Sequence, residues 1–150
     1  MSKRNTEENL WEMGIRVVLD SNIWIFYLKE RGDALKLLDI LDRSSATILI
    51  HAIIIEEVWR GVIAPRMRAR FVRALLAPNV RIFTWPLPLR IIKKYEALGL
   101  HNGDPVIAAF AEMVNADFLI TEDEDFNCLR QAENVPFRTV SIAEYLSLFR

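Results

Sequence analysis

Short apolar runs alternate along the chain with longer segments in which apolar residues recur at helical spacing. Apart from Arg16, the run "IRVVL" at residues 15–19 is apolar and mostly β-branched, and it is as long as a buried strand. Leu35, Leu38 and Leu41 instead recur at three-residue steps, as on one face of a helix. This pattern predicts strands at residues 15–19, 47–50, 80–83, 117–121 and 137–140. It predicts helices at residues 21–30, 34–43, 53–62, 66–76, 89–98, 105–114 and 142–149.

The order of these elements favours a single α/β domain. Strands that are short, apolar on both faces and separated by helices are typical of a parallel sheet covered on both sides. We therefore expect a three-layer α/β/α sandwich with a mainly parallel central sheet of about five strands. The length of 150 residues fits one such domain, which we place at residues 13–150 behind a polar N-terminal tail at residues 1–12.

Composition narrows the setting of this domain. No apolar run approaches the ~18 residues that a membrane span needs, and the polar N-terminus does not resemble a secretory signal. Cys128 is the only cysteine, which excludes an intrachain disulfide and a cysteine-based zinc site, and the two histidines exclude a histidine-rich site. We expect a cytoplasmic protein with no membrane partner. The net charge of −1 neither favours nor excludes a nucleic-acid partner.

Four carboxylates fall where the predicted strands end or the following helices begin. Asp20 follows the first strand, Glu57 lies on the helix after the second, Asp104 opens a helix, and Asp123 follows the strand at 117–121. In open α/β sheets, functional groups gather beyond the carboxyl ends of the strands, so these side chains are expected to converge. Carboxylate oxygens are the ligands that Mg²⁺ and Mn²⁺ prefer. The sequence therefore predicts a metal site that holds one of these ions.

Two of these acids have an ordinary structural interpretation as well. Asp20 is also suited to a turn or to capping the helix that follows it. Asp104 is suited to an N-cap with Pro105 in the first helical position, and from this motif alone capping is as plausible as catalysis. Glu57 is more informative, because its neighbour Glu56 lies four residues before Arg60 on the solvent side, which leaves Glu57 on the apolar side.

The segment "LITEDEDF" at residues 119–126 places four consecutive acids directly after an apolar run. Most of these side chains are expected to be solvated, with Asp123 pointing inward and Asp125 as the second choice for a metal ligand. Ser21 and Thr121 are suited to orienting an acid or a metal-bound water, and equally to being ordinary hydroxyls at strand ends.

A basic stripe offers a candidate contact for phosphates. Arg66, Arg70 and Arg73 fall on one face of the helix at 66–76. Such a stripe is also typical of a solvated helix face, and we favour that interpretation. The tryptophans at 24, 59 and 85 and Phe26 are suited to base stacking, but their helical spacing beside Ile and Leu favours a core or interface role.

Several segments together resemble the PIN-domain family, and especially the VapC-like toxins of bacterial and archaeal toxin–antitoxin modules. They are "VVLDSNIWIFYL", "IIIEEVWRGV", "GDPVIAAFAEMVNADFLITEDEDF" and "FRTVSIAEYL", and the resemblance spans residues 15–150. It implies a parallel sheet and carboxylates that bind Mg²⁺ or Mn²⁺ for RNA cleavage. By motif, these carboxylates are Asp20, Glu57, Asp104 and Asp123, with Asp125 near Asp123. The motifs also include Asn22 and Thr121 as supporting residues. His51 and Pro105 depart from the family pattern, in which a small hydroxyl residue and an alanine are common.

The resemblance implies a metal-dependent endoribonuclease, the toxin of a type II toxin–antitoxin pair, with RNA and a cognate antitoxin as partners. The many aromatic residues, among them four tryptophans and eight phenylalanines, also favour a homodimer with residues 22–28 and 34–41 at an interface or groove. The alternatives are a non-catalytic PIN-like binding module, which is expected to have lost some of the acids, and a receiver-type signalling domain. A receiver needs an acceptor aspartate and a lysine after particular strands, and "RIFTWP" and "FRTVSI" lack them. No glycine-rich phosphate loop follows the first strand, which argues against a dinucleotide site.

Overall fold

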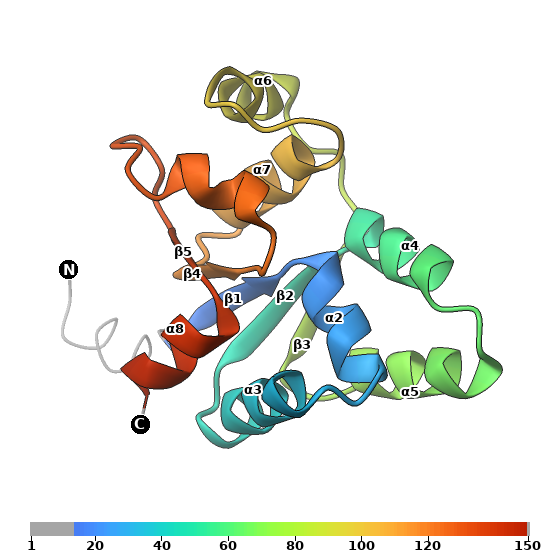
Figure 1. The fold of residues 1–150 in the computed structure, drawn as a ribbon. Coiled ribbons are helices and arrows are strands. Elements are labelled where there is room, and N and C mark those ends of the chain that lie inside the picture. Colours follow the sequence, from blue (N-terminus) through green and yellow to red (C-terminus); the bar gives the residue numbers. More distant parts are fainter. Residues whose placement is uncertain (1–13, 150) are drawn as a thin grey trace, which may run out of the picture.

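The computed structural model describes residues 14–149, so the predicted tail at residues 1–12 lies outside the described residues. Its centre is a sheet of five strands in the order β3-β2-β1-β4-β5 (Figure 1). The strands are β1 (Arg16–Leu19), β2 (Thr47–His51), β3 (Val80–Phe83), β4 (Phe118–Ile120) and β5 (Arg138–Val140). All five predicted strands are confirmed, and every neighbouring pair is parallel.

Helices cover both faces of this sheet. They are α2 (Ser21–Leu28), α3 (Gly32–Arg43), α4 (Ala52–Gly61), α5 (Pro65–Leu75), α6 (Leu89–Ala97), α7 (Asp104–Met113) and α8 (Ile142–Leu148). On one side α2 contacts α3, α4 and α5, and α3 contacts α8, while α6 packs against α7 on the other (Figure 1). This arrangement confirms the expected three layers. Within residues 14–149, every helix is too short or too polar to cross a membrane.

The central strand explains why the apolar runs carry no alternation. Val17, Val18 and Leu19 of β1 have no exposed surface, because strands flank β1 on both sides and helices cover both faces. On the side of α2, the indole of Trp24 is also fully buried and meets the ring of Phe71 on α5 edge-on, with centroids 5.6 Å apart. This aromatic pair joins two helices that the sequence separates by more than thirty residues.

One element was not predicted. The 3-10 helix η1 (Glu124–Leu129) follows β4 and buries Phe126 and Leu129. Its six residues are too few to display a helical period, so the acidic segment looked like a solvated turn in the sequence. This short helix fixes the direction in which the acids after β4 point.

The strand order also marks where a site is expected. From β1 the chain proceeds outward to β2 and β3 on one side, and later to β4 and β5 on the other. The order therefore reverses between β1 and β4, and a crevice forms beyond their carboxyl ends. The two ends are tied together, because the Asp20 N–H donates to the Ile120 carbonyl at 3.0 Å.

Candidate metal centre

Asp20 lies at the switch point and is almost entirely buried, with 3% of its surface exposed. One carboxylate oxygen accepts from the Ser21 N–H at 2.8 Å, so Asp20 does cap α2. The other oxygen accepts from the Thr121 hydroxyl at 2.7 Å, across the gap between β1 and β4. The predicted capping role is therefore confirmed, and Thr121 fixes the orientation of the carboxylate.

Glu57 approaches the same place from α4. It is half-buried and accepts from the Ser21 hydroxyl at 3.0 Å. Glu56 is exposed and forms the predicted ion pair with Arg60. The helix phase inferred from the sequence therefore holds, and Glu57 is the inward residue of the two.

Asp104 reaches the site from the start of α7, and here the capping interpretation was wrong. Gly103 occupies the N-cap position, Asp104 is the first residue of the helix, and Pro105 is the second. The reason is a tight turn in which the Asp104 N–H donates to the His101 carbonyl at 3.2 Å, which draws Asp104 into the helix. Within residues 14–149 the Asp104 carboxylate has no capping bond, and it faces other acids instead.

The four acids after β4 differ in their contacts and exposure. Glu122 turns away from the site, because one oxygen accepts from Arg31 at 3.2 Å and the other from the Ile142 N–H of α8 at 3.0 Å. Glu124 is exposed. Asp123 caps η1 by accepting from the Asp125 N–H at 2.9 Å. The first and second choices made from the sequence, Asp123 and Asp125, are the two that remain near the site.

Three carboxylates form a tight group at this edge of the sheet. Oxygens of Asp104, Asp123 and Asp125 lie within 4.8 Å of one another. Asp20 and Glu57 lie outside that group but close enough to act on Asp104 through their charges. Of the five acids proposed from the sequence, the structure thus gathers Asp104, Asp123 and Asp125 into one group and leaves Asp20 and Glu57 beside it.

The acids at this site raise one another's pKa through their like charges. Burial, together with the charges of Asp20, Asp123, Asp125 and Glu57, raises the pKa of Asp104 to about 7. Burial likewise raises the pKa of Asp20 to about 6, although its bonds to Thr121 and Ser21 act in the opposite direction. A divalent cation would lower both pKa values, because its positive charge stabilises the ionised carboxylates. The donor set therefore fits a hard cation.

Comparison with known proteins places the chain in a family. Residues 17–131 match the PIN domain family. This chain belongs to the PIN domain family. A search of curated proteins gave no match.

Solved structures share the fold of this PIN domain at low identity. The VapBC2 complex of Rickettsia felis, bound to a DNA fragment from their promoter, includes a chain with a TM-score of 0.61 and 20% identity, covering 85% of this chain and 98% of that one. FitAcB of Neisseria gonorrhoeae has a TM-score of 0.55 and 16% identity, and the match covers 85% of this chain and 98% of that one. PAE2754 of Pyrobaculum aerophilum has a TM-score of 0.55 and 17% identity, and the match covers 91% of this chain and 90% of that one.

The arginine stripe is not brought to the carboxylates. Figure 1 shows α5 on the opposite side of this PIN domain from α7, which Asp104 begins. Arg70 is also engaged locally, with its guanidinium 5.0 Å from the ring centre of Tyr27 and bonded to Glu30. Arg66 and Arg73 are exposed. These contacts favour the solvated-face interpretation of the stripe.

Sequence reasoning missed two residues that shape the site, and placed a third in only a supporting role. Arg31 withdraws Glu122 from the cluster, a contact across ninety-one residues that has no local signal. Gly103 lies so close to Glu57 that a Cβ atom there would be 3.2 Å from Oε1. Asn22 was a predicted supporting residue, and its Oδ1 is buried without a partner among the described residues.

Replacing Gly103 by alanine is expected to displace the Glu57 side chain by a few tenths of an ångström. The backbone at Gly103 has an ordinary helical conformation, so the free energy of unfolding should change by no more than about 1 kcal/mol. Divalent-cation affinity should fall severalfold. Gly32→Ala is the matched control, since nothing lies within 4 Å of its Cβ position. Equal Mn²⁺ affinities for the two variants in calorimetry would contradict the expected displacement of Glu57 by a Cβ atom at residue 103.

The pKa shifts also predict how the metal-free protein responds to pH. Asp104 and Asp20 have a pKa of about 7 and about 6, above the ordinary value of 3.8. Each therefore binds its proton more tightly in the folded state, and the free energy of unfolding should rise as the pH falls from 8 toward 5. Melting temperatures in EDTA should rise over this range. A melting temperature that stays constant or falls as the pH is lowered would contradict the raised pKa values of Asp104 and Asp20.

Proposed function

We propose that this chain is a metal-dependent endoribonuclease that uses Mg²⁺ or Mn²⁺ in the cytoplasm. The observation that carries the proposal is the group formed by Asp104, Asp123 and Asp125, whose oxygens lie within 4.8 Å of one another. Membership of the PIN domain family supports it, because PIN domains are generally nucleases. Asp20 and Glu57 complete the acidic site.

The roles of the side chains follow from their positions. Asp104, Asp123 and Asp125 would hold the cation, with Asp20 and Glu57 beside them. When bound, the cation supplies activation of a water and neutralisation of the charge that develops on the phosphate. Thr121 holds the Asp20 carboxylate in place, and Ser21 does the same for Glu57. These hydroxyls keep the carboxylates oriented while the phosphodiester is held at the site.

A circular RNA tests the class of reaction. An endonuclease opens a circle, whereas an exonuclease needs an end. We expect the protein with Mn²⁺ to linearise single-stranded circular RNA and to leave a circular DNA of the same sequence intact. RNA circles that persist while linear RNA is degraded would contradict endonucleolytic cleavage.

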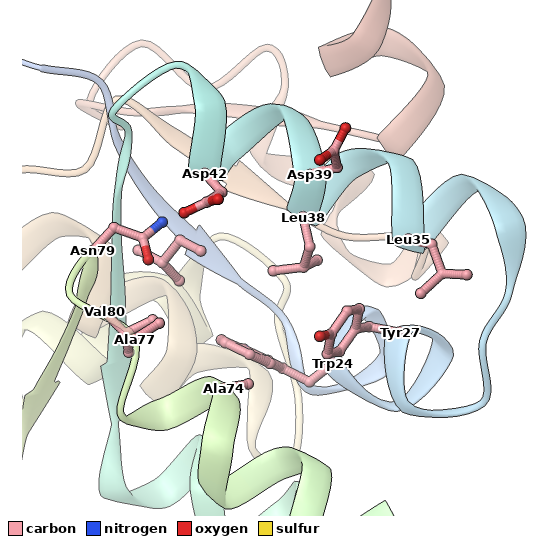
Figure 2. Close-up of a pocket in the computed structure, with 11 residues that line it drawn as sticks. Trp24, Tyr27, Leu35, Leu38, Asp39, Asp42, Ala74, Ala77, Asn79 and Val80 are labelled. Atoms are coloured by element: carbon pink, nitrogen blue, oxygen red, sulfur yellow. The ribbon is translucent and has the colours of Figure 1, made fainter.

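We further propose that the chain is the toxin of a type II pair and binds a cognate antitoxin protein. The fold it shares with a chain of the VapBC2 complex supports this partner class. A groove of about 370 Å³ between α2, α3 and α5 supports it as well. Figure 2 shows Trp24, Tyr27 and Leu38 facing one another along this groove, with Asp39 and Asp42 on α3. The groove includes parts of residues 22–28 and 34–41, the segments predicted to bind a partner.

Exposed apolar side chains outside this groove support a homodimer, which we also propose. Large apolar side chains are exposed on several elements, including Trp59, Ile63 and Leu76. We expect light scattering at micromolar concentration to give the mass of two chains. The mass of one chain would contradict the proposed dimer.

A further inference from the structure

His51 uses both ring nitrogens at the junction of β2 and α4. It is 6% exposed and occupies the N-cap position of α4, where Nδ1 accepts from the Ile53 N–H at 3.1 Å. Nε2 lies 2.8 Å from the Trp85 carbonyl oxygen. Since Nδ1 accepts a hydrogen bond, the proton of the neutral ring is on Nε2, which donates to Trp85. One neutral tautomer therefore satisfies both contacts.

The ring also joins three parts of the chain through packing. Its centroid lies 5.3 Å from that of Phe110 on α7 and 5.9 Å from that of Trp85, which follows β3. Phe83 packs against both Trp85 and Phe110, at 5.4 and 5.6 Å. His51 thus belongs to an aromatic cluster, formed with Phe83, Trp85 and Phe110, that links the start of α4 to α7.

These two helices carry facing groups of the metal centre. Glu57 lies on α4, and Asp104 is the first residue of α7. The approach is close, because a Cβ atom on Gly103 would lie 3.2 Å from the Glu57 Oε1. A small shift of α4 relative to α7 therefore changes the separation of the two carboxylates directly.

We propose that His51 is a positioning residue, whose bond to Trp85, a ring that packs against Phe110 of α7, holds Glu57 at the separation from Asp104 that cation binding needs. This inference rests on the proposed function, but it concerns geometry that can be measured without RNA. A serine or threonine could cap α4, yet its hydroxyl would reach neither the Trp85 carbonyl nor the Phe110 ring. The imidazole adds that second connection.

Two amide variants separate the cap from the connection. His51→Asn retains an acceptor in the place of Nδ1 and so retains the cap, but it is too short to reach Trp85. His51→Gln places its amide N–H₂ near the position of Nε2 and so retains the bond to Trp85, but glutamine is a poor cap. His51→Ala loses both contacts. Ile50→Val, a buried substitution in β2, is the control for a general loss of stability.

Mn²⁺ affinity, measured from the electron paramagnetic resonance of the free ion, gives the readout. We expect His51→Asn and His51→Ala to bind Mn²⁺ about tenfold more weakly than the wild type, and His51→Gln and Ile50→Val to remain close to it. In EDTA we expect His51→Asn to melt above His51→Gln, because only His51→Asn retains the cap. This order of melting temperatures is the opposite of the expected order of Mn²⁺ affinities. Affinities that follow the melting order, or wild-type affinity in His51→Ala, would overturn the inference.

The outcome can be separated from the proposed function. If the expected order of Mn²⁺ affinity appears and no RNA is cleaved, the positioning role holds and the ribonuclease proposal fails. If RNA is cleaved and every variant binds Mn²⁺ equally, the ribonuclease proposal holds and His51 has no positioning role. A wild type that binds no Mn²⁺ would overturn both.

Discussion

Replacing Asp104 by asparagine is expected to lower RNA cleavage by roughly 10³-fold or more while the fold remains intact. Asparagine preserves the size of the side chain but removes a charge from the group formed with Asp123 and Asp125. The charge in the first turn of α7 favours the helix by about 0.3–1 kcal/mol, and the relief of repulsion among the acids offsets its loss. Single-turnover cleavage and the melting temperature in EDTA measure the two effects.

Glu124→Gln is the matched control for this variant. It removes one negative charge from the neighbouring segment, at an exposed position outside the group. We expect its cleavage rate to match that of the wild type. Full activity in Asp104→Asn, or an equal loss in Glu124→Gln, would show that the charge of Asp104 has no specific role.

Mg²⁺ or Mn²⁺ at one hundred times its dissociation constant should raise the melting temperature of the wild type by about 5–10 °C. The reason is that a ligand at this concentration adds about 2.7 kcal/mol to the free energy of unfolding, and each kcal/mol shifts a domain of this size by about 2–4 °C. Asp20→Asn should gain far less from the ion. In EDTA, it should melt at or above the wild-type temperature, because ionised Asp20 is buried beside Glu57 and Asp123.

An exposed acid far from the site provides the control for Asp20. Asp42 lies at the end of α3 and lines the groove of Figure 2, so Asp42→Asn should respond to the ion as the wild type does. Scanning calorimetry with and without the ion measures both variants. An Asp20→Asn protein that gains as much as the wild type would remove Asp20 from the metal centre.

The fold was predictable because its signals are local. The burial of Val17, Val18 and Leu19 in β1 follows from three consecutive apolar residues, and the inward phase of Glu57 follows from the pairing of Glu56 with Arg60 four residues later. Both depend on residues within one or two turns of the chain. Strand positions and helix phase could therefore be inferred from spacing alone.

The details of the site were less predictable, because the exact form of a turn and contacts between distant residues decide them. Asp104 enters α7 through a turn with His101, whereas the "NGDP" motif left capping and catalysis equally plausible for Asp104. Glu122 leaves the cluster because of Arg31, and no pattern in the sequence announces that pair. The residues of the acidic segment could be narrowed to Asp123 and Asp125, but their place beside Asp104 depends on how η1 packs.

Cleavage of one defined single-stranded RNA by purified protein tests the central claim most directly. The reactions contain Mg²⁺, Mn²⁺ or EDTA, with Asp20→Asn purified in parallel to exclude a contaminating nuclease. We expect internal cleavage by the wild type with either ion, none in EDTA, and none by Asp20→Asn under any condition. Cleavage that persists in EDTA, or that is equal in Asp20→Asn, would contradict a nuclease that works through a cation held by these carboxylates.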